Sequence, residues 1–197
     1  MNDTSKLSPD ASPLRIANFR AYWLSRLSMT LAQYAMMLII GWQTYTIARG
    51  NGLNAFEASG QLALIGLLQF VPLFLLTPFS GWAADHFDRR NVARLTMLAQ
   101  LGCAATLTWF TWSETLTITA LFGVAIVLGI VRAFNGPALS ALAPNLVPKT
   151  ILPNAIALSS IAWQTGMIVG PAIGGYTQRA ACNQNASARA LARAHAL

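Results

Sequence analysis

Residues 58–84 read ASGQLALIGLLQFVPLFLLTPFSGWAA, a stretch of 27 residues without Asp, Glu, Lys or Arg. A helix needs roughly 20 mostly apolar residues to cross a lipid bilayer, so this stretch is long enough to span one. Its two prolines, Pro72 and Pro78, are tolerated in a membrane helix when neighbouring groups satisfy the carbonyls that they leave free. The stretch therefore predicts a transmembrane helix over about residues 61–83.

Similar stretches occur along the rest of the chain. Runs without charge cover 27–48, 95–113 and 150–178, and residues 115–148 contain only Arg132. By length and composition these runs predict an all-α membrane protein with about five transmembrane helices. The five spans are expected at about 24–47, 61–83, 95–112, 115–142 and 154–176.

The composition excludes several other classes of protein. Apolar residues make up 55% of the chain and charged residues only 10%, whereas soluble domains are about 25% charged. This excludes a soluble globular domain, a disulfide-stabilised scaffold and a disordered protein. The net charge of +7 does not indicate nucleic-acid binding, because the basic residues lie between the hydrophobic runs rather than on one face.

The basic residues are distributed unevenly between alternate loops. The polar arm, 1–20, and the start of the first span carry four of them up to Arg26, and the loop after the second span carries three arginines. The loops after the first and third spans carry one and none. Basic loops stay in the cytoplasm, so the arm is expected to be cytoplasmic and the transmembrane domain to cover 21–176.

Residues 177–197 do not fit this pattern. After five spans the tail is expected outside the cytoplasm, yet it carries Arg179, Arg189 and Arg193. It also contains eight alanines and no Val, Ile, Phe, Met or Trp. We expect a shifted reading frame or an abnormal end of the frame in this Ala/Arg-rich tail, with a tolerated disordered tail as the alternative.

The loop after the second span carries a specific pattern, GWAADHFDRR, which begins at Gly81. It resembles the signature G-x-x-x-D-R/K-x-G-R/K-R/K of the major facilitator superfamily and departs from it at His86 and Asp88. The resemblance implies a conformational-switch cluster that latches the two halves of a transporter in the outward-closed state. The matching residues are Gly81, Asp85, Arg89 and Arg90.

The fourth span contains RAFNG, which resembles the fourth-helix pattern R-x-x-Q-G of the same superfamily with Asn135 in place of Gln. Arg132 and Gly136 lie one turn apart on the same helix face. An arginine at membrane depth costs at least about 2.5 kcal/mol, so it normally faces a cavity or a partner. The resemblance implies that Arg132 tunes proton transfer or binds an anionic group of the substrate. The alternative is that its guanidinium reaches the lipid headgroups at the cytoplasmic side.

The fifth span contains GMIVGPAIGG, which resembles the signature G-x-x-x-G-P-x-x-G-G associated with antiporters. Gly166, Gly170 and Gly174 recur every four residues and form one smooth face for close helix packing. Pro171 adds a bend, and with Gly175 the segment is expected to act as a packing face and hinge. The resemblance implies that this glycine face contacts the second half of a transporter.

Together these motifs resemble the exporter-like branch of the superfamily, which contains siderophore and drug exporters. The resemblance implies a multi-pass protein of the bacterial inner membrane that corresponds to the first five helices of the N-terminal half of a twelve-helix fold. It also implies small-molecule export by alternating access, with proton coupling left open, and a missing C-terminal half without which the chain is expected to be inactive. The alternatives are a half-size subunit that needs a partner and a membrane scaffold that does not transport.

Polar residues within the spans are the expected cavity lining, since Asp and Glu fall only in loops or at span ends. Each is also an ordinary candidate for helix packing or the membrane interface. The residues are Gln33, Gln43, Gln69 and Gln164. We expect no enzymatic activity, cofactor or metal site, because neither a metal-ligand cluster nor a phosphate-binding loop occurs in the sequence.

Overall fold

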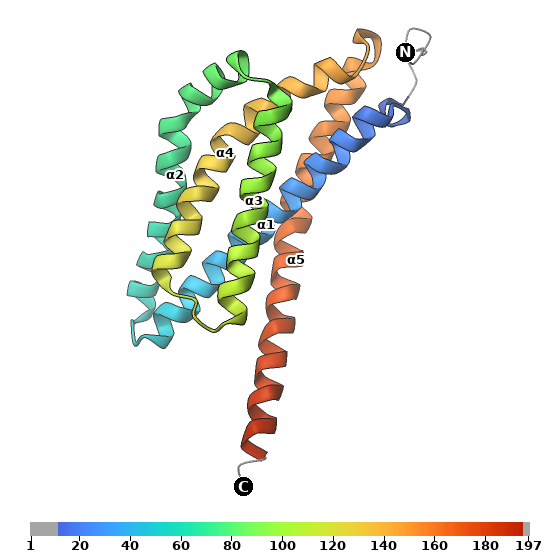
Figure 1. Cartoon of the computed structure of the whole chain (residues 1–197). Helices are drawn as coiled ribbons and strands as arrows, with labels where there is room; N and C mark the ends of the chain where they lie inside the picture. The colour runs from blue at the N-terminus through green and yellow to red at the C-terminus, as the bar shows by residue number, and fades with distance from the viewer. Residues whose placement is uncertain (1–11, 195–197) are drawn as a thin grey trace.

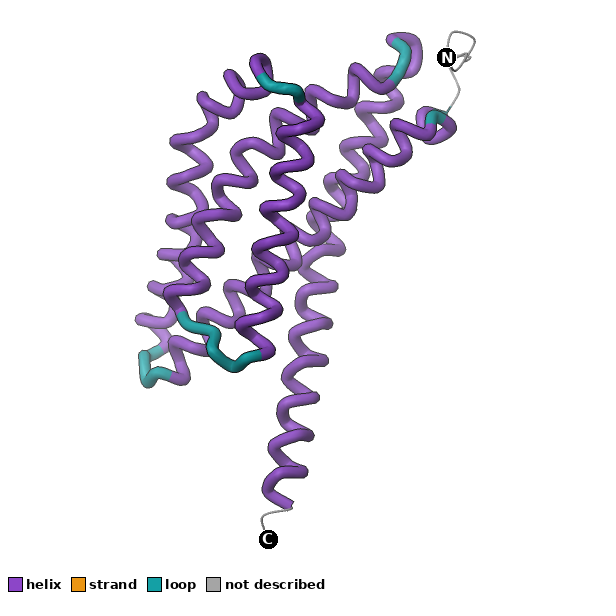
Figure 2. The backbone as a smooth tube through the Cα atoms, viewed as in Figure 1, coloured by secondary structure: helices purple, strands orange, loops and turns teal. Residues whose placement is uncertain are grey.

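The computed structural model describes residues 12–194, except for the side chains of 84–85, 89, 138, 141–145 and 181–194. These residues form long helices joined by short connections, and strands are absent from the described part (Figure 2). The elements are η2 (Pro13–Arg15), α1 (Ala17–Gly50), α2 (Ala55–His86), α3 (Arg89–Trp112), α4 (Ile118–Leu146), η3 (Lys149–Ile151) and α5 (Leu152–Ala194).

Side-chain caps fix the starts of the three middle helices. Asn54 and Glu57 form a capping box at the start of α2, each accepting a hydrogen bond from the backbone N–H of the other. Asp88 accepts from the backbone N–H of Arg90 at the start of α3, and Thr117 accepts from that of Ala120 at the start of α4. The caps satisfy N–H groups that have no partner within the helix.

The five helices run alternately up and down (Figure 1). The described start of the chain, the α2–α3 connection and the α4–α5 connection lie at one end of the bundle. The α1–α2 and α3–α4 connections lie at the other end, which we call the distal end. The C-terminal part of α5 runs past the other helices beyond the distal end.

Two helix pairs dominate the packing: α1 lies along α5, and α2 lies along α4. The third long contact is that of α3 with α4, while α1 and α4 also touch each other. Two hydrophobic clusters follow from this arrangement. One, around Phe19 and Ile151, joins α1, α3, α4 and α5, and the other, around Ile40 and Leu121, joins α1, α2, α3 and α4.

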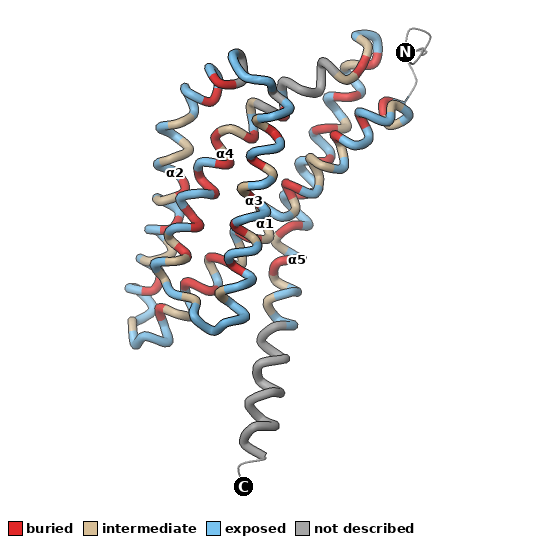
Figure 3. The backbone as a smooth tube through the Cα atoms, viewed as in Figure 1, coloured by how far each residue is buried: buried red, intermediate tan, exposed pale blue. Residues whose placement is uncertain are grey.

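Large apolar side chains face outward over much of the bundle. In Figure 3, exposed residues predominate along the described part of α2, whereas buried residues recur along the described part of α4. Three helical segments of the described chain are long and apolar enough to cross a membrane: Ala55–Ala83, Ile118–Pro137 and Lys149–Ala180. An exposed apolar surface of this extent suits lipid rather than water. The chain is an all-α integral membrane protein of about five helices, as the sequence predicts.

The helices differ from the expected spans mainly at their ends. The fourth helix begins at Ile118 rather than near 115, because Thr117 caps it. The fifth continues to Ala194, whereas the sequence predicts a span that ends at about 176. Alanine is the strongest helix former, and neither Gly nor Pro follows Gly175 to break the helix.

Candidate functional site

The glycine face of α5 packs against α1. A Cβ placed on Gly166 would lie 2.6 Å from Cβ of Thr30, and one on Gly170 would lie 2.9 Å from the carbonyl oxygen of Leu31. A Cβ on Gly174 would lie 2.8 Å from the carbonyl oxygen of Ala35. No side chain larger than hydrogen fits at these positions without displacing α1.

This contact corrects one expectation from the sequence. The partner of the glycine face is α1 of the same chain, not a second transporter half. Trp23 reinforces the pair by donating a hydrogen bond of 2.9 Å from Nε1 to the carbonyl of Leu158. Pro171 is half-buried, and a Cβ on Gly175 would have no atom within 4 Å, so Gly175 is not part of the contact.

A second close approach joins α4 to α2, at a position outside the three sequence motifs. A Cβ on Gly129 would lie 2.5 Å from the carbonyl oxygen of Gln69. Gly129 stands midway between two buried alanines, Ala125 and Ala133, in a four-residue rhythm of small side chains. That rhythm is the same packing signal as in α5 and was visible in the sequence.

The loop motif lies where α2 ends and α3 begins. Asp85 is in the last turn of α2 and Arg89 is the first residue of α3, but their side chains lie outside the description. Gly81 and Arg90 are exposed, and no atom lies within 4 Å of a Cβ placed on Gly81. The described contacts do not test a switch cluster here, so it stays a prediction.

The fourth-helix motif lies in the middle of α4. Arg132 is half-buried, and its guanidinium makes no hydrogen bond or ion pair with another described side chain. Asn135 is buried with its Oδ1 unpartnered, whereas Gly136 is exposed. The described contacts leave both interpretations of Arg132 standing.

A second arginine, Arg26, enters the bundle interior on α1, although the sequence suggested only a loop-flanking charge. Its Nη1 donates a 2.8 Å hydrogen bond to Oη of Tyr22, which donates a 2.9 Å bond to the carbonyl of Leu139 in α4. Its Nε is buried without a partner. On α3, the buried Gln100 donates to the carbonyl of Met29 at 2.8 Å. These bonds tie α1 to α4 and to α3 at the first hydrophobic cluster, of which Tyr22, Met29 and Leu139 are members.

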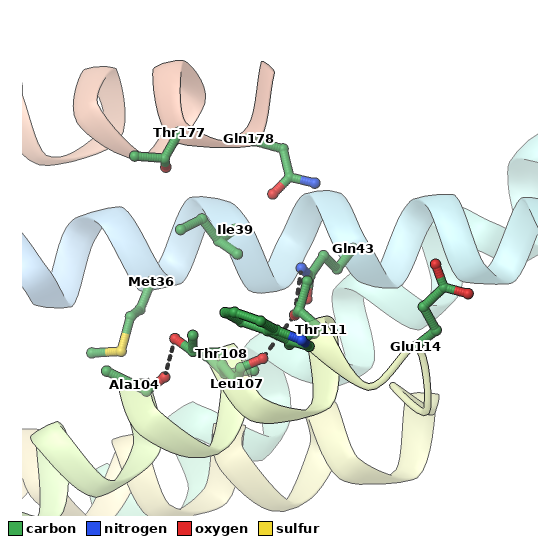
Figure 4. A pocket seen from close by; sticks show the side chains of 11 residues that line it. Met36, Ile39, Gln43, Ala104, Leu107, Thr108, Thr111, Glu114, Thr177 and Gln178 are labelled. Carbon is green, nitrogen blue, oxygen red and sulfur yellow. Dashed lines mark hydrogen bonds between the residues drawn. The ribbon is translucent and has the colours of Figure 1, made fainter. Parts of the chain in front are cut away.

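The described part of the bundle also holds a groove of about 710 Å³ near the distal end, between α1, α3 and α5 (Figure 4). This volume falls in the range of ligand pockets. Its polar lining includes Gln43, Thr108, Thr111, Glu114, Thr177 and Gln178. Gln43 is buried; its Nε2 donates to Oγ1 of Thr111 at 3.3 Å, and its Oε1 has no partner.

The four glutamines expected to line a cavity therefore have different surroundings. Gln43 lines the distal groove. Gln69 is buried against α4, Gln33 is half-buried and Gln164 is exposed. Among the described residues, the four glutamines do not line one common cavity.

The fold and these helix contacts define a class of protein: a polytopic helical membrane protein packed through glycine faces. A family model described as transmembrane secretion effector matches residues 8–188. The chain therefore belongs to this family of major facilitator superfamily transporters.

Curated relatives agree with this assignment. The staphyloferrin A transporter of Staphylococcus aureus is 27% identical over 124 residues, which cover 62% of this chain and 31% of the relative. The macrolide efflux protein A of Streptococcus pyogenes is 29% identical over 112 residues, covering 57% of this chain and 28% of the relative. The chain thus spans less than a third of the length of these relatives. No solved structure matches it.

Proposed function

We propose that the chain forms the first five helices of the N-terminal half of an exporter that moves a small organic molecule by alternating access. The match of the transmembrane secretion effector model over residues 8–188 carries this proposal. The superfamily fold holds substrate near the midplane between two halves, and this chain supplies only one wall of such a cavity. We therefore expect the chain not to transport substrate without the opposite wall, and its family assignment supports a transporter rather than an enzyme.

The substrate class proposed is a natural product of the siderophore or macrolide type. The names of the relatives, staphyloferrin A transporter and macrolide efflux protein A, support this class. The word efflux in the name of the second relative supports export rather than uptake. Arg132 is the proposed intramembrane cation for an anionic group of the substrate or for proton coupling, since it lies half-buried in the middle of α4.

The proposed orientation places the described start of the chain in the cytoplasm of a bacterial cell. The α2–α3 and α4–α5 connections lie at the same end as that start. Arg90 and Arg94 lie in the first turns of α3, and Lys149 lies between α4 and α5. Basic residues next to transmembrane helices favour the cytoplasmic side. The loop motif, with Gly81, Asp85, Arg89 and Arg90, is then proposed as a cytoplasmic switch between the two halves.

A flux assay tests the proposed activity. The chain is reconstituted in proteoliposomes, and efflux of a labelled macrolide is measured with and without a proton gradient. We expect the rate of empty liposomes for the chain alone and a gradient-dependent rate when the remaining helices of a complete family member are added. Substrate-dependent flux by the isolated chain would contradict the requirement for a second half.

A sequencing read tests the proposal about the tail. The nucleotide sequence after the Tyr176 codon is translated in all frames and continued downstream. A frame that encodes a further apolar span and then a second half would support a shifted reading frame in 177–197. Early stops in every frame would contradict it and would favour a half-size subunit that acts with a partner.

A further inference from the structure

Two half-buried arginines lie on α1 and α4, which contact each other in the bundle. The 2.9 Å hydrogen bond from Oη of Tyr22 to the carbonyl of Leu139 fixes the register of this antiparallel pair (Figure 1). Arg26 lies one turn from Tyr22 toward the distal end, and Arg132 lies two turns from Leu139 in the same direction. The two arginines are therefore separated along the bundle by about one helical turn.

Neither guanidinium has an acidic partner among the described side chains. In Arg26, Tyr22 holds Nη1 and Nε is enclosed, whereas Nη2 is neither bonded nor enclosed. A carboxylate that reaches Nη2 also reaches Nε, because these two nitrogens form one edge of the guanidinium and donate two parallel hydrogen bonds. The spans expected at 24–47 and 115–142 contain no Asp or Glu, so they supply no counter-charge to Arg26 or Arg132.

Asn135 adds a hydrogen-bond acceptor beside the two cations. It lies one turn from Leu139, at about the level of Arg26, and on the same face of α4 as Arg132. Its side chain is only 9% exposed, and Oδ1 is enclosed without a donor. A buried acceptor without a partner is unfavourable, and a ligand hydroxyl supplies the missing donor. The three side chains thus match a molecule that carries carboxylates and a hydroxyl.

We propose that Arg26, with Arg132 and Asn135, binds a hydroxy-polycarboxylate and thereby gives the exporter a preference for carboxylate-rich molecules over amine-bearing macrolides. Two guanidinium charges attract carboxylates and repel an ammonium group at the same place. Arg26 lies in the third turn of α1, toward the end that the proposed orientation places in the cytoplasm, where an exporter takes up its cargo. The inference rests on the proposed function for the role of the bound molecule as cargo, but its test needs no transport.

The test measures binding to the full chain in nanodiscs of uncharged phosphatidylcholine. The probe is radiolabelled citrate, a hydroxy-tricarboxylate, in equilibrium dialysis with empty nanodiscs subtracted. The competitors are tricarballylate, which is citrate without its hydroxyl, and erythromycin, an amine-bearing macrolide. The variants are Arg26→Gln and Arg132→Gln. The matched control is Arg20→Gln, which removes the same charge from an exposed position of α1.

We expect Arg26→Gln and Arg132→Gln each to weaken citrate binding at least about ten-fold, and Arg20→Gln to change it less than about two-fold. Arg26→Lys keeps the charge but loses the planar fork, so it should also weaken binding. Circular dichroism checks that each variant keeps its helices, and Arg26→Lys carries the test if Arg26→Gln does not fold. Equal binding by the parent and the folded Arg26 variants would overturn the proposal, as would an equal loss in Arg20→Gln.

The competitors test the chemistry of the bound molecule. Tricarballylate should compete about five-fold less well than citrate, and Asn135→Leu should abolish that difference because it removes the acceptor for the hydroxyl. Erythromycin should not displace citrate, and displacement by it would contradict the preference for carboxylates. Absence of citrate binding overturns the inference even if the flux assay succeeds. Failure of the flux assay alone contradicts the proposed function and leaves arginine-dependent binding intact.

Discussion

The α1–α5 pair and the α2–α4 pair achieve the same close packing with different amounts of glycine. Three glycines of α5, spaced by four residues, bring it against the backbone of α1. In α4 a single glycine, Gly129, reaches the backbone of Gln69, with alanines one turn away on either side. Close approach therefore needs small side chains at a four-residue rhythm and a glycine only where backbone meets backbone.

The difference explains why the packing face of α5 was found in the sequence and that of α4 was not. The glycine face of α5 coincides with a family motif, whereas the Ala–Gly–Ala rhythm of α4 is hidden in a generally apolar helix. Glycine also does not guarantee a contact. Gly123 and Gly175 belong to the same two helices, yet a Cβ at either would meet no atom within 4 Å.

The largest effect is expected for Gly170→Leu. The Cβ alone would lie 2.8 Å from Cβ of Tyr34, and the larger side chain would force α5 away from α1. Overpacking typically costs 1–3 kcal/mol, and we expect about 3 kcal/mol here because backbone lies close as well. Unfolding by SDS in mixed micelles, followed by circular dichroism, measures the loss. The control Gly175→Leu should unfold at nearly the same SDS fraction as the parent chain. Equal losses of stability in both variants would contradict the distinction between contact and non-contact glycines.

Gly129→Ala tests whether the α2–α4 pair depends on its single glycine. The added methyl would lie 2.5 Å from the carbonyl oxygen of Gln69, so the helices must shift. We expect a loss of about 2 kcal/mol in the same unfolding measurement. Gly123→Ala in the same helix is the matched control and should be neutral or slightly stabilising, since alanine favours helix. If Gly129→Ala leaves the stability unchanged, α2 can shift to accommodate the methyl group, and the α2–α4 pair does not depend on this glycine.

Tyr22→Phe tests the polar link between the pairs. It removes the hydrogen bond to the Leu139 carbonyl and the acceptor for Arg26. Interhelical hydrogen bonds in membranes contribute about 0.6 kcal/mol on average and up to about 1.7, and we expect about 1 kcal/mol. Tyr176→Phe, at an exposed tyrosine of α5, is the control. If both variants unfold alike, the link between α1 and α4 adds nothing measurable.

The smallest effect is expected for Asn54→Ala, at the exposed start of α2. The substitution leaves the backbone N–H of Glu57 without its acceptor, and loss of such a cap costs about 1 kcal/mol at most sites. Most of α2 is held by packing on α4, so we expect no more than this. Hydrogen exchange at Ala55 to Ala58 should accelerate while that of α4 stays unchanged. Faster exchange throughout both helices would mean that the cap controls the whole pair.

The spacing of charged residues predicted the five-helix fold, because a bilayer requires long apolar segments and the runs with at most one charge supply them. The ends of the helices were less predictable, since caps such as Thr117 and the helix-forming tail act outside the apolar runs. The sequence also gave no means of choosing the partner of the glycine face. That choice depends on which helix lies opposite, which is a property of the assembled bundle.

The polar contacts in the interior of the bundle were harder to predict from the sequence than the helix ends. Gln43 was named as cavity lining and lies in the distal groove, but Gln100 and Arg26 were not singled out. Arg26 stands at the edge of a charge-free run and resembles any flanking basic residue in the sequence. Only the three-dimensional contacts show that its Nε is enclosed and that Tyr22 holds its Nη1.

The pairing of α1 with α5 also sets the order of events during synthesis. The first described transmembrane helix packs against the fifth, with more than 100 residues between Leu31 and Gly166. At about 5–20 residues per second, this delay is on the order of 10 s. Throughout that time, the face of α1 around Thr30 and Ala35 lies against lipid, the translocon or another protein. The α1–α5 pair therefore forms only when the fifth helix is inserted, and a ribosome that stalls before Gly166 leaves α1 without its principal partner.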